Sequence, residues 1–158
     1  MMSLMSIMVQ GQSIPTTFLN CTVGKSTKAE VISQLSSKGH NPFSNDSKGL
    51  FYSFINTSHP KIDDTTPKFC DTWWHTASFS FTGNNRLIEI YLDNVYISAE
   101  AAKRYYDIVK KYLYDNYRQS FWQYGQPVTT TNMIEKESVY YKSGDYYIKL
   151  SYQHLLCN

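Results

Sequence analysis

The segment 72–92 constrains the fold most, because its side chains follow the pattern of an antiparallel hairpin. Apolar residues alternate with serine and threonine from Thr72 to Phe81, and Leu87 to Leu92 repeats the alternation with isoleucine and leucine on one face. The turn formers Gly83-Asn84-Asn85 separate the two runs. This pattern predicts two paired strands with one buried face and one polar face.

A second hairpin is predicted near the C-terminal end of the sequence. Strands over 139–142 and 146–152 flank the turn sequence Ser143-Gly144-Asp145. Residues 50–55 form a further short, aromatic-rich strand, and 127–137 has the polar composition of a linker.

Two helices are predicted, one before each group of strands. The first should span 27–38, because Thr27 and Glu30 form a capping box and Gly39 follows as a helix-ending residue. The second should run from Ser98 to about 120, where apolar and charged residues recur on opposite faces at helical spacing.

The order of elements is therefore helix, three strands, helix, two strands. Because the strands are joined by hairpins, we expect an α+β fold, a two-layer sandwich. An antiparallel sheet of four to five strands should carry both helices on one face. The chain of 158 residues lies within the range of one domain, and we predict a single domain over 13–158.

The composition excludes several classes of protein. Only 18% of the residues are charged and 16% are aromatic, so the chain should collapse into a core rather than stay disordered. A net charge of +2 is too small to indicate nucleic acid as a partner. We find no apolar run of the roughly 18 residues that a transmembrane segment requires.

Residues 1–12, MMSLMSIMVQGQ, resemble the apolar part of a truncated signal peptide. The first basic residue of the chain is Lys25, so the basic start of such a peptide is missing. The alternative is an ordinary N-terminal arm. If the segment is a signal peptide, the protein is periplasmic or secreted.

The three cysteines are Cys21, Cys70 and Cys157, and none lies in a C-x-x-C motif. A Cys21–Cys70 disulfide is feasible in an oxidising compartment. The alternative is that all three are small hydrophobic residues, at least partly buried.

The opening Val23-Gly24, followed by the capped helix with Val31, Leu35 and Gly39, resembles small exported bacterial proteins. These are the outer-membrane-assembly lipoproteins and the proteins of the β-lactamase-inhibitor-protein-like fold. The later pattern is similar to exported proteins of gut Bacteroidetes; it comprises Trp74, Phe79-Ser80-Phe81, Arg86 to Ile90 and a tyrosine-rich helix ending near 124–127. The resemblance implies a non-enzymatic binding or assembly role.

Sequence motifs of common enzymes and of nucleotide or metal sites are missing, so we predict no metal and no cofactor. Asp71 and His75 are the best acid–base pair that the sequence offers. Four residues apart on a strand they would lie about 13 Å from each other, so they could act together only across a bend. A small hydrolase-like enzyme using Asp71 and His75 is the alternative function.

The aromatic residues point to binding instead. Trp73-Trp74-His75 places adjacent tryptophans on opposite faces of a strand, so one of them should enter the core and the other should face outward. Exposed Trp and Tyr supply much of the energy at binding surfaces; the alternative is a strand buried on both sides. The leading hypothesis is an exported, non-enzymatic binding or assembly protein that uses an aromatic-lined sheet face against a protein or glycan of the cell envelope. Its candidate binding residues are Trp73, Trp74, His75, Trp122, Tyr141 and Tyr147.

Overall fold

The computed structural model describes residues 13–155 except 48, 56–65, 95–97 and 130–132. The predicted signal peptide over 1–12 and Cys157 lie outside the described residues. The contacts divide the chain into two compact units, described separately below. The N-terminal unit is Pro15–Val109; the C-terminal unit starts at Lys110 and also includes Ile14. The single domain over 13–158 stays a prediction.

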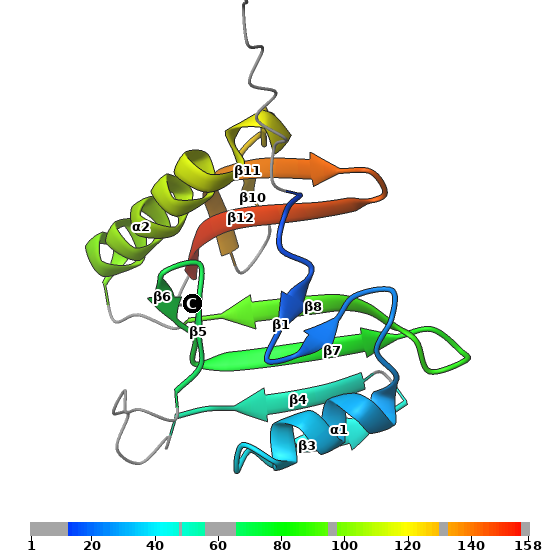
Figure 1. The fold of residues 1–158 in the computed structure, drawn as a ribbon. Helices are drawn as coiled ribbons and strands as arrows, with labels where there is room; N and C mark the ends of the chain where they lie inside the picture. Colours follow the sequence, from blue (N-terminus) through cyan, green and yellow to red (C-terminus); the bar gives the residue numbers. More distant parts are fainter. Residues whose placement is uncertain (1–12, 48, 56–65, 95–97, 130–132, 156–158) are drawn as a thin grey trace, which may run out of the picture. The chain divides into compact units, whose positions relative to one another are not determined.

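The α+β class is confirmed, with helices and antiparallel strands in the chain (Figure 1). The main sheet of the N-terminal unit has the strand order β3-β4-β7-β8. Its strands are β3 (Ser44–Asp46), β4 (Gly49–Ser53), β7 (Thr76–Phe81) and β8 (Leu87–Asp93). Two small hairpins accompany it: β1 (Thr17–Phe18) with β2 (Cys21–Thr22), and β5 (Lys68–Phe69) with β6 (Thr72–Trp73).

The hairpin β7–β8 is the one predicted from the alternating pattern. Phe79 pairs with Ile90 and Ala77 pairs with Leu92, so these side chains share the core face of the sheet. The predicted strand over 72–81 is interrupted, however, because Trp74 and His75 leave the ladder. The backbone N–H of Trp74 donates to the carbonyl of Pro67 at 2.9 Å, and that of His75 donates to the side-chain oxygen of Asn94 at 2.6 Å.

Helix α1 (Lys28–Ser36) has the predicted capping box. The backbone N–H of Thr27 donates to Oε2 of Glu30 at 2.7 Å, and the Glu30 N–H donates back to the Thr27 hydroxyl at 3.3 Å. The Thr27 N–H, together with the Thr27 hydroxyl that donates to the same Oε2 at 3.0 Å, stabilises the carboxylate and lowers the pKa of Glu30 below its ordinary value. The helix buries Val31 and Leu35 in one cluster with the apolar residues of β4 and β7, so it covers the core face of the sheet.

The C-terminal unit contains a second, separate sheet of four strands (Figure 1). Strand β11 (Met133–Ser143) pairs along one edge with β12 (Tyr146–Leu155), as the predicted second hairpin requires. Its other edge pairs with β9 (Phe121–Tyr124) and β10 (Val128–Thr129).

Two expectations are corrected by this sheet. The strands do not form one sheet in the described residues, and much of the presumed linker over 127–137 is strand. The physical reason is local: β9 and β10 are close in sequence to β11, so their pairing costs little loop entropy and fills the edge of that strand. We predicted that both helices lie on one face of a single sheet. Because the described strands form separate sheets, that prediction does not hold.

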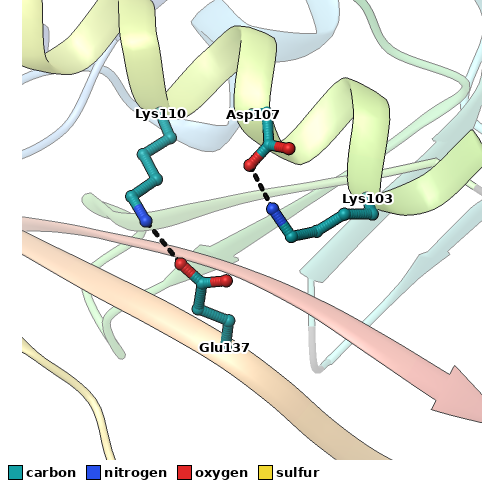
Figure 2. A network of polar contacts seen from close by, with 4 residues as sticks. All are labelled: Lys103, Asp107, Lys110 and Glu137. Atoms are coloured by element: carbon teal, nitrogen blue, oxygen red, sulfur yellow. Dashed lines mark hydrogen bonds and ion pairs between the residues drawn. The ribbon is translucent and has the colours of Figure 1, made fainter. Parts of the chain in front are cut away.

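Helix α2 (Ala99–Tyr117) follows Ser98 as expected, and the Ala101 N–H donates to the Ser98 hydroxyl at 3.1 Å. It ends in the short 3-10 helix η1 (Arg118–Ser120). Lys110 forms an ion pair with Glu137 of β11, whereas Lys103 pairs with Asp107 of the helix itself (Figure 2). Within the described part of the chain, neither helix has the length and apolar character needed to cross a membrane.

Candidate functional site

The predicted binding residues fall into two groups in different units of the molecule. Trp73, Trp74 and His75 belong to the N-terminal unit, and the other three belong to the C-terminal sheet. Each group is therefore a separate candidate.

Both tryptophans of the first group are half-buried, whereas the sequence predicted one inside and one outside. The indole N–H of Trp74 donates to the carbonyl of Phe69 at 2.9 Å, and the Asn94 side chain donates to the carbonyl of Trp73 at 2.7 Å. The irregular connection between β6 and β7 thus replaces the strict alternation of a strand. These contacts fit a structural role for the two residues.

Asp71 and His75 have different partners in the structure. The carboxylate of Asp71 lies 3.1 Å from the ammonium of Lys68, and both side chains are exposed. Burial lowers the pKa of His75, and the nearby charge of Asp93, not that of Asp71, acts against this shift. The geometry therefore gives the enzyme hypothesis no support. Over the described residues, no group of three or more His, Cys, Asp or Glu is arranged to hold a metal ion.

Cys21 and Cys70 are both buried, free thiols, so the bridge between them that the sequence allowed is absent from the structure. Burial raises the pKa of Cys21 to about 11 and that of Cys70 to about 12. The alternative interpretation, small buried hydrophobic residues, describes these two positions.

In the second group, Tyr141 is a core residue. Its exposed fraction is 1%, it pairs with Ile148 across the β11–β12 ladder, and its ring contacts Phe121 edge-on at 5.8 Å. Burial also raises the pKa of its hydroxyl. Tyr141 therefore cannot take part in a binding surface on the opposite side of the sheet.

The opposite side of this sheet gathers aromatic and lysine side chains. Tyr140 pairs with Lys149 and Lys142 pairs with Tyr147, and directly paired residues point to the same side of a sheet. Gln123 of β9 pairs with Tyr140 and lies on this side too. We call this surface the aromatic–lysine face; its residues are Trp122, Gln123, Tyr140, Lys142, Tyr147 and Lys149.

Trp122 reaches this face because of an irregularity in strand pairing. Tyr140 pairs with Gln123 but Tyr141 pairs with Phe121, so Trp122 has no direct partner on β11. Strict alternation from Gln123 would turn Trp122 toward the core face, and a bulge re-aims the side chain. Its ring instead meets Tyr140 edge-on at 6.1 Å, with the ammonium of Lys142 at 5.1 Å from the ring centroid.

The face combines a paired lysine with exposed rings. Lys149 donates to buried Glu135 at 2.6 Å and lies 5.8 Å from the ring centroid of Tyr140. Burial by itself would lower the pKa of Lys149, but the hydrogen bond and charge of Glu135 outweigh it and raise the pKa. Trp122 is 52% exposed and Tyr147 is 63% exposed. The Trp122 ring is thus held by Tyr140 and Lys142 and is still accessible, as is the Tyr147 ring.

Sequence reasoning found Trp122 and Tyr147 but missed Tyr140, Lys142 and Lys149. A signal for them exists: the pattern Tyr-x-Lys occurs in both strands, as Tyr140-Tyr141-Lys142 and Tyr147-Ile148-Lys149. With the two-residue period of a strand, this pattern places a ring and an ammonium side by side on one face.

The chain matches no family model, and no curated protein or solved structure matches it. The resemblance to outer-membrane-assembly lipoproteins and to the β-lactamase-inhibitor-protein-like fold therefore stays a prediction.

Proposed function

We propose that this protein is an exported, non-enzymatic binding protein whose aromatic–lysine face binds a protein or glycan of the cell envelope. The observation that carries the proposal is the exposure of Trp122 and Tyr147 on one face of the β9–β12 sheet. The apolar N-terminal pattern over 1–12 supports export.

Exposed rings contribute less to folding than buried rings do. An exposed indole gains little from folding, since most of the stabilisation by an aromatic side chain comes from removing its surface from water. Trp and Tyr at the centre of a surface are the residues that most often dominate binding energy. Lys142 and Lys149 hold the ring orientations of Trp122 and Tyr140 through cation–π contacts, which prepares the face for a ligand.

The test compares two double variants that each remove two exposed aromatic side chains. Trp122→Ala/Tyr147→Ala removes rings from the aromatic–lysine face. Phe43→Ala/Tyr91→Ala is the matched control, because these rings are 80% and 54% exposed in the other unit. Each protein is immobilised and exposed to purified envelope proteins and a panel of envelope glycans.

We expect the wild type and the control variant to bind the same component, and the Trp122/Tyr147 variant to lose at least about tenfold in affinity. Equal affinity of all three proteins would contradict the proposal. Far-UV circular dichroism of each variant checks that the fold is retained.

Export is tested separately by expressing the chain with its upstream reading frame in the source cell and fractionating the cells. We expect exported protein that lacks residues 1–12 when its N-terminus is read by mass spectrometry. Exported protein with an intact segment would contradict the signal-peptide interpretation.

A further inference from the structure

We propose that the ligand of the aromatic–lysine face is an anionic glycan, a sugar chain that carries carboxylate or sulfate groups. This inference rests on the proposed function, which leaves protein and glycan open. It assigns one ring-shaped, negatively charged ligand class to a defined part of the sheet, the surface around Trp122, Lys142 and Tyr147.

The charge argument comes from comparing lysines that lie over aromatic rings. Among the described residues, five lysines do so: Lys68, Lys103, Lys110, Lys142 and Lys149. All except Lys142 also hold a carboxylate, as the pairs Lys68–Asp71, Lys103–Asp107, Lys110–Glu137 and Lys149–Glu135 show. In the part of the chain that the structure describes, Lys142 alone of these five has no carboxylate partner. Its ammonium remains available to an anion from outside the chain.

The ring argument comes from the neighbours of Lys142. Its ammonium lies 5.1 Å from the ring centroid of Trp122, and Tyr147 is its direct cross-strand partner. The face of an aromatic ring is electron-rich, and the C–H face of a sugar ring is apolar and carries partial positive charge. A sugar ring therefore complements an exposed indole or phenol, while its acidic substituent complements Lys142.

Hydrogen-bonding groups on the same face complete the match with a sugar. Gln123 is exposed and shares the face with Tyr140, and Ser151 pairs with Ser138 two residues further along β12. Amide groups both donate and accept hydrogen bonds, as sugar hydroxyls do. A few polar groups around aromatic surface are the usual composition of a site for small ring-shaped ligands.

The same observations argue against nucleic acid and against a large protein interface. A protein that follows a nucleic-acid backbone neutralises several phosphates, whereas this face offers one uncompensated ammonium and the chain carries a net charge of +2. A stable protein interface buries about 800 Å² on each partner around a desolvated centre. On this face the large rings that are exposed are those of Trp122 and Tyr147, which is few for such a centre.

The experiment measures binding of defined oligosaccharides to the full chain by isothermal titration calorimetry. The probes are tetragalacturonate for carboxylate, a heparin-derived tetrasaccharide for sulfate, and cellotetraose and maltotetraose as neutral sugars. A single-stranded dT8 oligonucleotide tests nucleic acid. The variants are Lys142→Gln, Lys142→Arg and Trp122→Ala, with Lys111→Gln as the matched control at an exposed lysine of α2.

We expect binding of at least one anionic tetrasaccharide, about tenfold weaker with Lys142→Gln because a charge-assisted contact is lost. Lys142→Arg should retain most of the affinity and Lys111→Gln all of it. Trp122→Ala should weaken binding by a similar factor, and 0.5 M NaCl should weaken it further. The carboxylate and sulfate arms identify which acid the face accepts.

Two outcomes overturn the inference while leaving the proposed function standing. These are stronger binding of a neutral sugar, and binding of an envelope protein that depends on Trp122 when no tetrasaccharide binds. Binding of dT8 in place of the sugars contradicts both the inference and the proposed function. If Trp122→Ala/Tyr147→Ala alters no interaction in either experiment, both the inference and the proposed function fail.

Discussion

The outer faces of the two four-stranded sheets differ in the side chains that surround their aromatic rings. On the β3-β4-β7-β8 sheet, the side turned away from the core presents Thr76, Ser78 and Ser80, and the Ser80 hydroxyl donates to Glu89 at 3.2 Å. On the β9–β12 sheet, the corresponding side presents two tyrosines, a tryptophan and two lysines. Ser78 pairs with Phe51 on one neighbouring strand and with Tyr91 on the other, so the first sheet also has rings on this side. Those rings lie among serine, threonine and carboxylate side chains, whereas the rings of the second sheet lie beside lysines.

This comparison distinguishes the buried side chains that folding requires from the exposed side chains that it does not require. The core of the first sheet, with Tyr52, Phe79 and Leu87 fully buried, accounts for its stability while its outer face stays in water. The second sheet has a comparable buried side in Val139, Tyr141 and Leu150. The exposed rings of Trp122 and Tyr147 are additional to that core and share their face with Lys142 and Lys149, which is why we assign the function to them.

The largest effect should come from Gly49→Ala in the first sheet. Gly49 has φ +151°, and a Cβ there would lie 2.2 Å from the carbonyl oxygen of Phe79 in the paired strand. Because that atom belongs to the backbone of the ladder, the strands must move apart, and we expect a loss of about 3 kcal/mol. Urea unfolding measures this. Gly83→Ala is the control, since nothing lies within 4 Å of its added carbon and its stability should change little.

The second-largest effect tests the ion pair beneath the aromatic–lysine face. Lys149→Met leaves Glu135 buried without its ammonium, and we expect a loss of about 2 kcal/mol, reduced from fully buried pairs because Lys149 is partly exposed. Lys111→Met removes a pair in which both side chains are exposed and should cost less than about 0.5 kcal/mol. Equal losses in urea unfolding would show that this charge pair does not stabilise the second sheet. Adding Glu135→Gln to Lys149→Met should restore part of the stability.

A smaller effect is expected from Gly125→Ala, where the chain passes closely over the second sheet. A Cβ at Gly125 would lie 1.9 Å from the Ser138 hydroxyl oxygen and 2.9 Å from the Tyr140 ring. These are side-chain atoms, which can shift, so the loss should be about 1–2 kcal/mol, less than for Gly49. The Ser138 hydroxyl is buried without a hydrogen-bond partner, so Ser138→Ala alone should be nearly neutral.

The double variant Gly125→Ala/Ser138→Ala decides whether the hydroxyl is the obstacle. We expect most of the lost stability to return, as a coupling in a double-mutant cycle. If the stability losses of the two single variants simply add, the hydroxyl is not the obstacle. The strain then lies in the backbone, as it does at Gly49 in the first sheet.

Local patterns in the sequence predicted much of this comparison. The capping box of Thr27 and Glu30 and the alternation in β7 and β8 act over a few residues, so they hold in the structure. Sequence reasoning could not foresee that β9 would pair with β11, because Phe121–Tyr124 follows a long helix without a turn signal.

The candidate site was harder to predict than the fold. Tyr140 and Tyr141 are adjacent and chemically identical, so composition cannot tell which one faces the core. The pairing of Ser143 with Tyr146 decides it, since this two-residue turn sets Tyr141 opposite Ile148. Trp122 depends in addition on a bulge, which shifts a side chain to the other face without a sequence signal of its own.

The smallest effect concerns alkaline pH, at which the buried thiols of the first sheet's unit should lower its stability. Burial raises the pKa of Cys70 from 9.0 to about 12, so the folded state keeps its proton where the unfolded state has lost it. This contribution is fully present below pH 9 and is lost as the pH rises toward 12. By linkage it amounts to about 1.4 kcal/mol between pH 8 and pH 10.

Cys70→Ala removes this contribution, so its urea midpoint should fall less between pH 8 and pH 10 than that of the wild type, under reducing conditions. Cys21, with a pKa raised to about 11, should account for a similar share, and Cys21→Ala tests it. Lys149 in the second sheet differs, because its pKa is raised from an ordinary value of 10.5, so its contribution is lost only at higher pH. If neither cysteine variant reduces the fall of the urea midpoint, the alkaline sensitivity does not come from the buried thiols. The two units then do not differ in this source of alkaline sensitivity.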